Sequence, residues 1–254
     1  MLILKRLNLD SSWHINFDGV GFIVDPWLIG SEVDGFKWLN QQWHTKEPVD
    51  VREIPSYKFI FVSQNYEDHC HIKTLHNLPK DKPILASEKA YHKLKNFFTD
   101  REIVLLEENK KIDFKELSFI VFRPKKLFDP IYFAVVIINK KKQAIFYAPH
   151  GFLLNKEQLN LIRKYSFDLL ITTFTQFNLP SFMGGEVNPG MGNVYKLHQQ
   201  IKPSYTINTH DEKKISKGLV SLLSKISYPN FREIESNNSI NFKKINNYNE
   251  IKII

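Results

Sequence analysis

The chain has very little cysteine and no long apolar segment. Cys70 is the only cysteine among 254 residues, so no disulfide can form within one chain. No apolar run approaches the ~20 residues that a membrane-spanning helix requires. The first residues, Met1–Arg6, lack the basic start, apolar centre and small-residue cleavage site of a signal peptide. These absences predict a cytoplasmic protein without a membrane segment.

Basic residues outnumber acidic ones. Lys and Arg number 35 against 27 Asp and Glu, which gives a net charge of +8. Such a balance suits an anionic partner such as nucleic acid. The lysines are scattered, however, and the run at 140–142 lies between two apolar stretches, where a hairpin turn is expected. The sequence therefore favours a small-molecule substrate over nucleic acid and leaves the oligomeric state open.

Metal-binding side chains follow an expected strand near residue 60. The apolar run Phe59–Val62 is bracketed by polar residues, as in a buried strand. The next nine residues, Ser63–His71, are called the donor loop here and include Asp68, His69 and His71. In open α/β sheets, functional sites gather beyond the carboxyl ends of the strands. The sequence thus predicts a site at the end of this strand.

Two later strands are expected to end in the same way. Ala144–Ala148 precedes His150, and Ser204–Thr209 precedes His210. A single histidine at a strand end is more often a hydrogen-bonded structural group than a metal ligand. Three such strand ends in one chain allow two equally good interpretations. They form a shared site, or they are separate structural residues.

With these residues in view, the chain resembles the metallo-β-lactamase-fold superfamily, in particular its metal-dependent hydrolases that degrade ascorbate-derived lactones. Ile15–Leu28 is similar to the family's paired strands ending in Asp-Pro-Trp, and Ile201–His210 to its late Lys-Pro strand ending in a metal-binding histidine. The resemblance covers roughly residues 1–225. It implies an α/β fold, a four-layer αββα sandwich, in one domain over 1–254 with 229–254 as a peripheral extension.

The chain departs from the family at the first of its two metal positions. The family carries His-x-His-x-Asp-His after a strand, whereas the donor loop reads Gln64-Asn65-Tyr66-Glu67-Asp68-His69. Gln64 and Tyr66 thus replace two histidines. The third would fall near 122–125, but no histidine occurs between His92 and His150. The resemblance implies that the first metal position has lost its three protein ligands.

The second metal position keeps enough donors for an ion. In the family it uses the Asp and His of the motif, a bridging Asp and a final His. Here Asp68, His69 and His210 match three of these, and His150 stands where the bridging Asp would be. Four donors suit a structural ion, and three plus water a catalytic one. We predict one divalent metal ion, with zinc as the expected element and iron or manganese as alternatives.

Further residues are predicted to line the pocket. Gln64 and Tyr66 stand at the lost ligand positions, and Tyr66 offers a hydrogen bond or, if deprotonated, a ligand oxygen. Asp25 either orients a ligand histidine or only begins a turn. His71 is a fifth metal donor or a spare histidine, and Cys70 is either a small buried filler or a reactive, metal-facing thiol.

Two irregular segments are expected beside these strand ends. Residues 27–43 are rich in Trp and Phe, and residues 176–191 in Gly, Pro and Asn. Such segments either line a pocket or form packed loops, and we expect pocket walls beside the donor loop. Helices are expected at 87–98, 155–165, 194–200 and 212–226, and the first and last of these are amphipathic.

Two classes of function follow from this sequence. One is a metal-dependent hydrolase with a degenerate active site, in which one metal ion activates water and polarises a carbonyl or phosphoryl group. The other is a non-catalytic relative that kept the fold and a binding pocket. The first is favoured, although fold alone does not define function.

Overall fold

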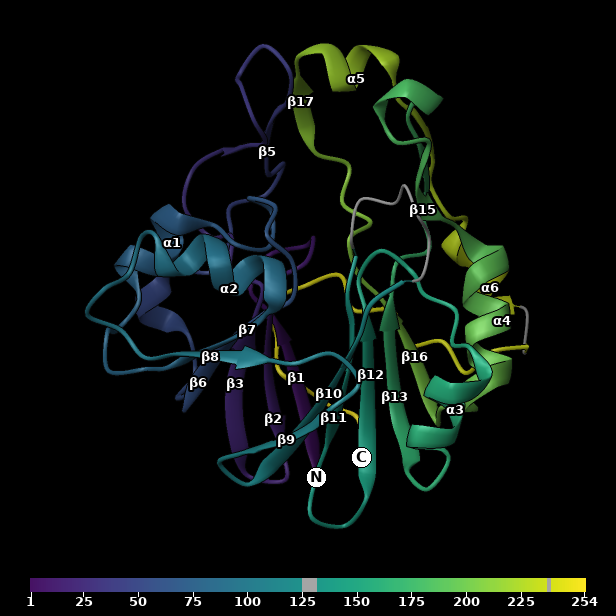
Figure 1. The fold of residues 1–254 in the computed structure, drawn as a ribbon. Coiled ribbons are helices and arrows are strands. Elements are labelled where there is room, and N and C mark those ends of the chain that lie inside the picture. The colour runs from purple at the N-terminus through teal and green to yellow at the C-terminus, as the bar shows by residue number, and fades with distance from the viewer. Residues whose placement is uncertain (125–131, 237–238) are drawn as a thin grey trace. The chain divides into compact units, whose positions relative to one another are not determined.

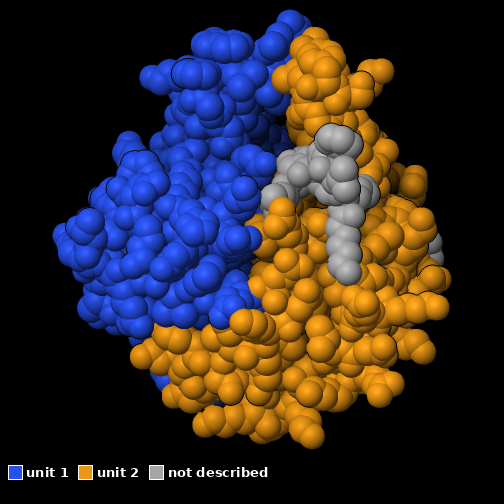
Figure 2. Space-filling view, viewed as in Figure 1, with its two compact units in different colours: residues 1–107, 212–222, 246–254 blue, residues 108–211, 223–245 orange. Residues whose placement is uncertain are grey.

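The computed structural model describes residues 1–124, 132–236 and 239–254 (Figure 1). Within these residues the chain forms two compact units, coloured separately in Figure 2. Unit 1 comprises residues 1–107, 212–222 and 246–254, and unit 2 comprises residues 108–211 and 223–245. The sequence predicts a single domain over 1–254. Whether the two units form one domain is not decided by their separate descriptions, so this stays a prediction.

A seven-stranded sheet with the order β19-β1-β2-β3-β6-β7-β8 forms the centre of unit 1. Its strands are β1 (Leu2–Arg6), β2 (Trp13–Phe17), β3 (Val20–Val24), β6 (Phe59–Val62), β7 (Ile84–Ser87), β8 (Ile103–Leu106) and β19 (Ile251–Lys252). The β2–β3 hairpin turns at Asp18-Gly19, where both residues have positive φ, as the two-residue turn signal predicts. Strands β3, β6, β7 and β8 are parallel, so their carboxyl ends share one edge.

Two helices pack on this sheet in unit 1, α1 (Ile72–Asn77) and α2 (Glu88–Lys95). Leu75 of α1 and Leu94 of α2 belong to the same apolar core as Ile60 and Val62 of β6. Strands β3 and β6 are buried at every position, as expected for parallel strands covered on both faces. A short 3₁₀ turn, η1 (Val51–Glu53), precedes β6.

A small second sheet in unit 1 corrects one helix prediction. Residues 212–226 form β17 (Ile215–Lys217), the short helix α5 (Leu219–Leu223) and β18 (Lys225–Ser227) instead of one amphipathic helix. β17 pairs with β5 (Gln41–Trp43), which pairs with β4 (Glu32–Val33). Gly218 has φ +106°, and a Cβ there would lie 2.6 Å from the Leu39 carbonyl oxygen. This close backbone approach interrupts the helix.

Unit 2 contains a six-stranded sheet with the order β16-β13-β12-β11-β10-β9. Its strands are β9 (Lys111–Phe114), β10 (Leu117–Phe122), β11 (Ala134–Ile138), β12 (Gln143–Ala148), β13 (Ser166–Thr172) and β16 (Tyr205–Asn208). Strands β9 to β12 are antiparallel, whereas β12, β13 and β16 are parallel. The carboxyl ends of β12 and β16 therefore lie at one edge. The apolar run 131–138 also predicts a strand, and its first residue, Ile131, lies outside the described residues. Lys125, at the end of 122–125, lies outside them as well.

Helices α3 (Lys156–Ile162) and α4 (Met191–Ile201) pack on this sheet through Ile162, Leu197 and Ile201. Asn155 caps α3 at the point where the expected helix 155–165 starts, and it forms a capping box with Gln158. The remaining elements of unit 2 are β14 (Gln176–Asn178), η2 (Ser181–Met183), β15 (Glu186–Pro189), β18 and α6 (Phe231–Ser236).

Residues 229–254 contribute to both units. In unit 2, Ile234 of α6 joins a small core with Phe174 and Val194. In unit 1, β19 pairs with β1. Among the described residues, every helix is too short or too polar to span a bilayer.

Candidate metal centre

Asp25 is the fixed point at the carboxyl edge of the sheet in unit 1. It follows β3, is fully buried, and its backbone nitrogen donates to the carbonyl oxygen of Phe61 (2.9 Å). Its carboxylate accepts from the backbone nitrogen (2.7 Å) and hydroxyl (2.6 Å) of Ser63. The donor loop is thus tied to the end of β3 at its first residue.

His69 is oriented by the same carboxylate. Its Nδ1 donates to Asp25 Oδ2 at 2.8 Å, and its Nε2 lies 3.6 Å from Asp68 Oδ2. Burial disfavours the imidazolium, but the negative charges of Asp68 and Asp25 outweigh burial and raise the pKa of His69 to about 9. A histidine whose Nδ1–H is held by a carboxylate presents Nε2 as its ligand nitrogen, the usual arrangement around protein-bound metals.

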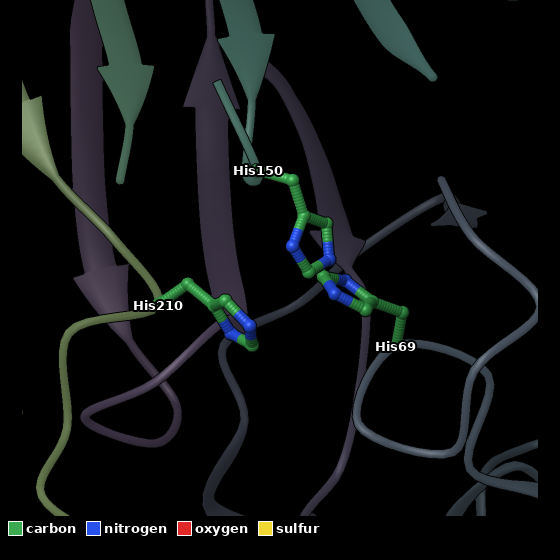
Figure 3. Close-up of side chains that lie close together, drawn as sticks. All are labelled: His69, His150 and His210. Atoms are coloured by element: carbon green, nitrogen blue, oxygen red, sulfur yellow. The ribbon is translucent and has the colours of Figure 1, made fainter. Parts of the chain in front are cut away.

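His150 and His210 form a pair at the carboxyl edge of the sheet in unit 2. They follow the parallel strands β12 and β16, and their ring centroids are 4.6 Å apart at an interplanar angle of 70°. Figure 3 shows the two rings directed toward each other; it also draws His69, which belongs to unit 1. His150 Nδ1 donates to Asn188 Oδ1 at 2.8 Å, so its Nε2 is the nitrogen with the lone pair.

The backbone around this pair adopts tight turns. Gly151 has φ +78°, and a Cβ there would lie 2.8 Å from Pro189 Cγ. His210 has φ +57°. The next residue, Asp211, accepts from the backbone nitrogens of Phe174 (3.0 Å) and Thr175 (2.8 Å), and burial raises its pKa. Asp211 therefore orders the loop after β13.

Comparison with solved structures identifies the fold. No family model matches the chain, and no curated protein does. Among solved structures, an isothiocyanate hydrolase from Delia radicum gut bacteria has a TM-score of 0.70 at 15% identity, covering 98% of both chains. Igni18, a metallo hydrolase from Ignicoccus hospitalis, has a TM-score of 0.68 at 12% identity, covering 98% of this chain and 97% of its own. The metallo-β-lactamase fold protein YhfI from Bacillus subtilis has a TM-score of 0.61 at 10% identity, covering 98% of both chains.

The chain has the metallo-β-lactamase fold. The predicted fold class is thereby confirmed, and the neighbours include metal-dependent hydrolases. Sequence identities of 10–15% establish the fold alone.

His71 caps a helix in this metallo-β-lactamase fold. It is the N-cap of α1, where its Nδ1 accepts from the Thr74 backbone nitrogen (3.2 Å). Its Nε2 donates to the Ser31 carbonyl oxygen (3.3 Å). Both ring nitrogens thus have protein partners, which favours the spare histidine of the two roles that the sequence left open.

The residues at the two lost ligand positions are both enclosed. Gln64 is fully buried. Burial, with the nearby charges of Asp34 and Asp68, raises the pKa of Tyr66 to about 12. The phenol is therefore neutral near pH 7 and is available as a hydrogen-bonding group.

The segment 27–43 lies beside the donor loop, as predicted. Asp34 Oδ1 accepts from the Glu67 backbone nitrogen (3.0 Å), and the Trp27 and His71 ring centroids are 6.3 Å apart. Both segments belong to unit 1. Residues 176–191 are also expected to lie beside the donor loop. They belong to unit 2, so this expectation stays a prediction.

Sequence reasoning missed an acidic group in unit 1. Lys214 Nζ lies 2.9 Å from Asp10 Oδ2 and 3.9 Å from Asp68 Oδ2. Oxygen atoms of Glu32, Asp34 and Asp68 lie within 4.8 Å of one another. Asp10 and Lys214 are 204 residues apart in sequence, so no local motif signals the group.

Cys70 is predicted to be inert in the native protein. It is fully buried in the apolar core with Ile60 and Leu75, so it acts as the small buried filler. Burial also raises the pKa of its thiol to about 12, which makes the reactive thiolate scarcer at pH 8 than for an ordinary cysteine. We expect no mass shift with iodoacetamide at pH 8 in buffer and full modification in urea. Native modification at the rate of a free thiol would contradict this placement.

Proposed function

We propose that the protein is a metal-dependent hydrolase that binds one divalent ion through Asp68 and His69 of unit 1 and His150 and His210 of unit 2. The observation that carries this proposal is that hydrogen bonds orient two histidine rings in the way that metal ligands are oriented. His69 and His150 each follow a parallel strand and each donate from Nδ1 to a fixed oxygen acceptor, on Asp25 and Asn188. Each ring therefore presents Nε2, which is the orientation that metal-bound histidines commonly have.

The donor set fits zinc, with iron or manganese as alternatives, because three imidazoles and one carboxylate are borderline ligands. Such an ion lowers the pKa of bound water and polarises a carbonyl or phosphoryl oxygen. The chain's own contribution is positioning: Asp25 holds the His69 ring, and Asn188 holds the His150 ring. We further propose a small-molecule substrate and a cytoplasmic location.

A non-catalytic binding protein is the second candidate. Gln64 and the neutral Tyr66 occupy the positions of two metal-binding histidines, which favours this alternative over two-metal chemistry. A metal-free protein after neutral purification without chelators would support it.

Turnover with and without metal tests the hydrolase directly. The purified protein is stripped with a chelator, reloaded with zinc, iron or manganese, and assayed on a lactone, an aryl ester, a phosphodiester and an isothiocyanate. The isothiocyanate is included because a neighbour of the same fold is an isothiocyanate hydrolase. We expect hydrolysis of at least one of the four substrates only after reloading, and its loss in His150→Ala. Equal turnover by stripped and reloaded protein would contradict metal dependence.

We expect weak or absent β-lactam hydrolysis. The resemblance gives efficient enzymes of that kind a complete His-x-His pair, and Gln64 and Tyr66 cannot supply two neutral imidazoles. The test is turnover of a chromogenic lactam by the zinc-loaded protein, with a dedicated metallo-β-lactamase as the reference. A rate comparable to that reference would contradict the loss of the first metal position.

A further inference from the structure

We propose that unit 1 contains a separate site for a hard divalent cation, best matched by calcium, formed by the carboxylates of Glu32, Asp34 and Asp68. The site goes beyond the proposed hydrolase centre and shares only Asp68 with it. All three residues belong to unit 1. Glu32 lies on β4, Asp34 directly follows that strand, and Asp68 lies in the donor loop.

The geometry of the three carboxylates suits calcium. One oxygen from each residue lies within 4.8 Å of the other two. Calcium binds oxygen at about 2.3–2.6 Å, so two of its ligands can be separated by up to about 5 Å, and three carboxylate oxygens this close can reach one ion. The three residues offer only oxygen donors, which hard cations prefer over imidazole or thiolate.

Glu32 provides the independent observation. Its side chain is 1% exposed, and its Oε2 has no hydrogen-bond partner. Its other oxygen lies 3.4 Å from Asn40 Nδ2, a long contact. A buried carboxylate oxygen without a partner is costly, and Glu32 belongs to the same cluster as Asp34 and Asp68. A bound cation would satisfy it.

Charge balance points the same way. Among the residues that the structure describes, no Lys or Arg lies within ion-pair distance of Glu32 or Asp34, since Lys214 pairs with Asp10 and approaches only Asp68. His69 is paired with Asp25. In the described part of the chain, the Lys214 ammonium therefore lies beside Asp68 at the edge of the cluster, and no Lys or Arg pairs with Glu32 or Asp34. A divalent cation would supply positive charge beside these two residues.

Such a cation would fasten the segment 27–43 to the donor loop. The two already meet where Asp34 accepts from the Glu67 backbone nitrogen. Because the cation would bind only the folded arrangement, calcium should also raise the melting temperature by mass action.

Calcium titration of the full-length, chelator-stripped protein tests the site. We expect one calcium ion per chain by calorimetry and a rise in melting temperature with calcium. Glu32→Gln and Asp34→Asn preserve shape while removing charge, and each should weaken calcium binding at least tenfold. Glu53→Gln, a change at an exposed acidic residue of η1 in the same unit, should leave it unchanged. Circular dichroism of each variant checks folding.

Two outcomes would overturn the site: no calcium binding to the wild type at millimolar concentration, or undiminished binding in Glu32→Gln. His210→Ala separates the two proposals, because it should lose the transition metal and keep calcium. Loss of calcium binding in that variant would show that the acidic site is not separate. Failure of zinc binding with calcium binding intact would refute the hydrolase proposal alone.

Discussion

Replacing Asp25 by alanine is expected to lower the free energy of unfolding by about 3–5 kcal/mol, the usual cost of removing one partner of a buried ion pair. Asp25 is fully buried and accepts from both Ser63 groups and from His69 Nδ1. Its removal leaves the buried His69 ring beside Asp68 alone. Asp25 also has φ +47°, a conformation that alanine adopts less readily than aspartate. Urea denaturation followed by tryptophan fluorescence measures the loss.

Two variants control this experiment. Asp25→Asn keeps the shape and one acceptor oxygen and tolerates positive φ, so it should lose less stability than Asp25→Ala. Asp113→Ala removes an exposed carboxylate of β9 that contacts Ser118 and Lys111, and should cause no measurable change. If Asp25→Ala is as stable as Asp113→Ala, Asp25 does not hold the donor loop.

Replacing His210 by alanine is expected to weaken transition-metal binding by more than about 100-fold. Loss of an outer partner of a metal ligand already costs about 10–100-fold, and loss of the ligand itself should cost more. The affinity is measured by competition with a chromophoric chelator. His92→Ala, on an exposed position of α2, is the matched control and should bind as the wild type does. Equal affinities of the two variants would show that His210 is a structural residue.

Local signals in the sequence were sufficient for most of the fold. Buried strands such as Phe59–Val62, the Asp18-Gly19 turn and the Asn155 cap each depend on residues close in sequence. The helix predicted at 212–226 failed because its apolar spacing competes with a long-range constraint. The backbone at Gly218 meets that of Leu39, where Leu219 and Val220 donate to the carbonyl oxygens of residues 38 and 39. No pattern within 212–226 encodes that contact.

The candidate site shows the same division. The strand-end positions of Asp25, His69, His150 and His210 follow from short apolar runs, because parallel strands bring their carboxyl ends to one edge of each sheet. Roles that depend on a specific partner did not follow. His71 serves as a helix cap instead of a donor. The Asp10–Lys214 pair and the Glu32 cluster join residues from distant segments, and only the three-dimensional structure brings them together.

The central claim, one transition-metal ion held by Asp68, His69, His150 and His210, is tested most directly by counting metal. Protein purified at neutral pH without chelators is analysed by elemental mass spectrometry, as wild type and as His150→Ala. The account predicts one transition-metal ion per chain in the wild type and close to none in the variant. Two such ions in the wild type, or one ion undiminished in His150→Ala, would contradict it.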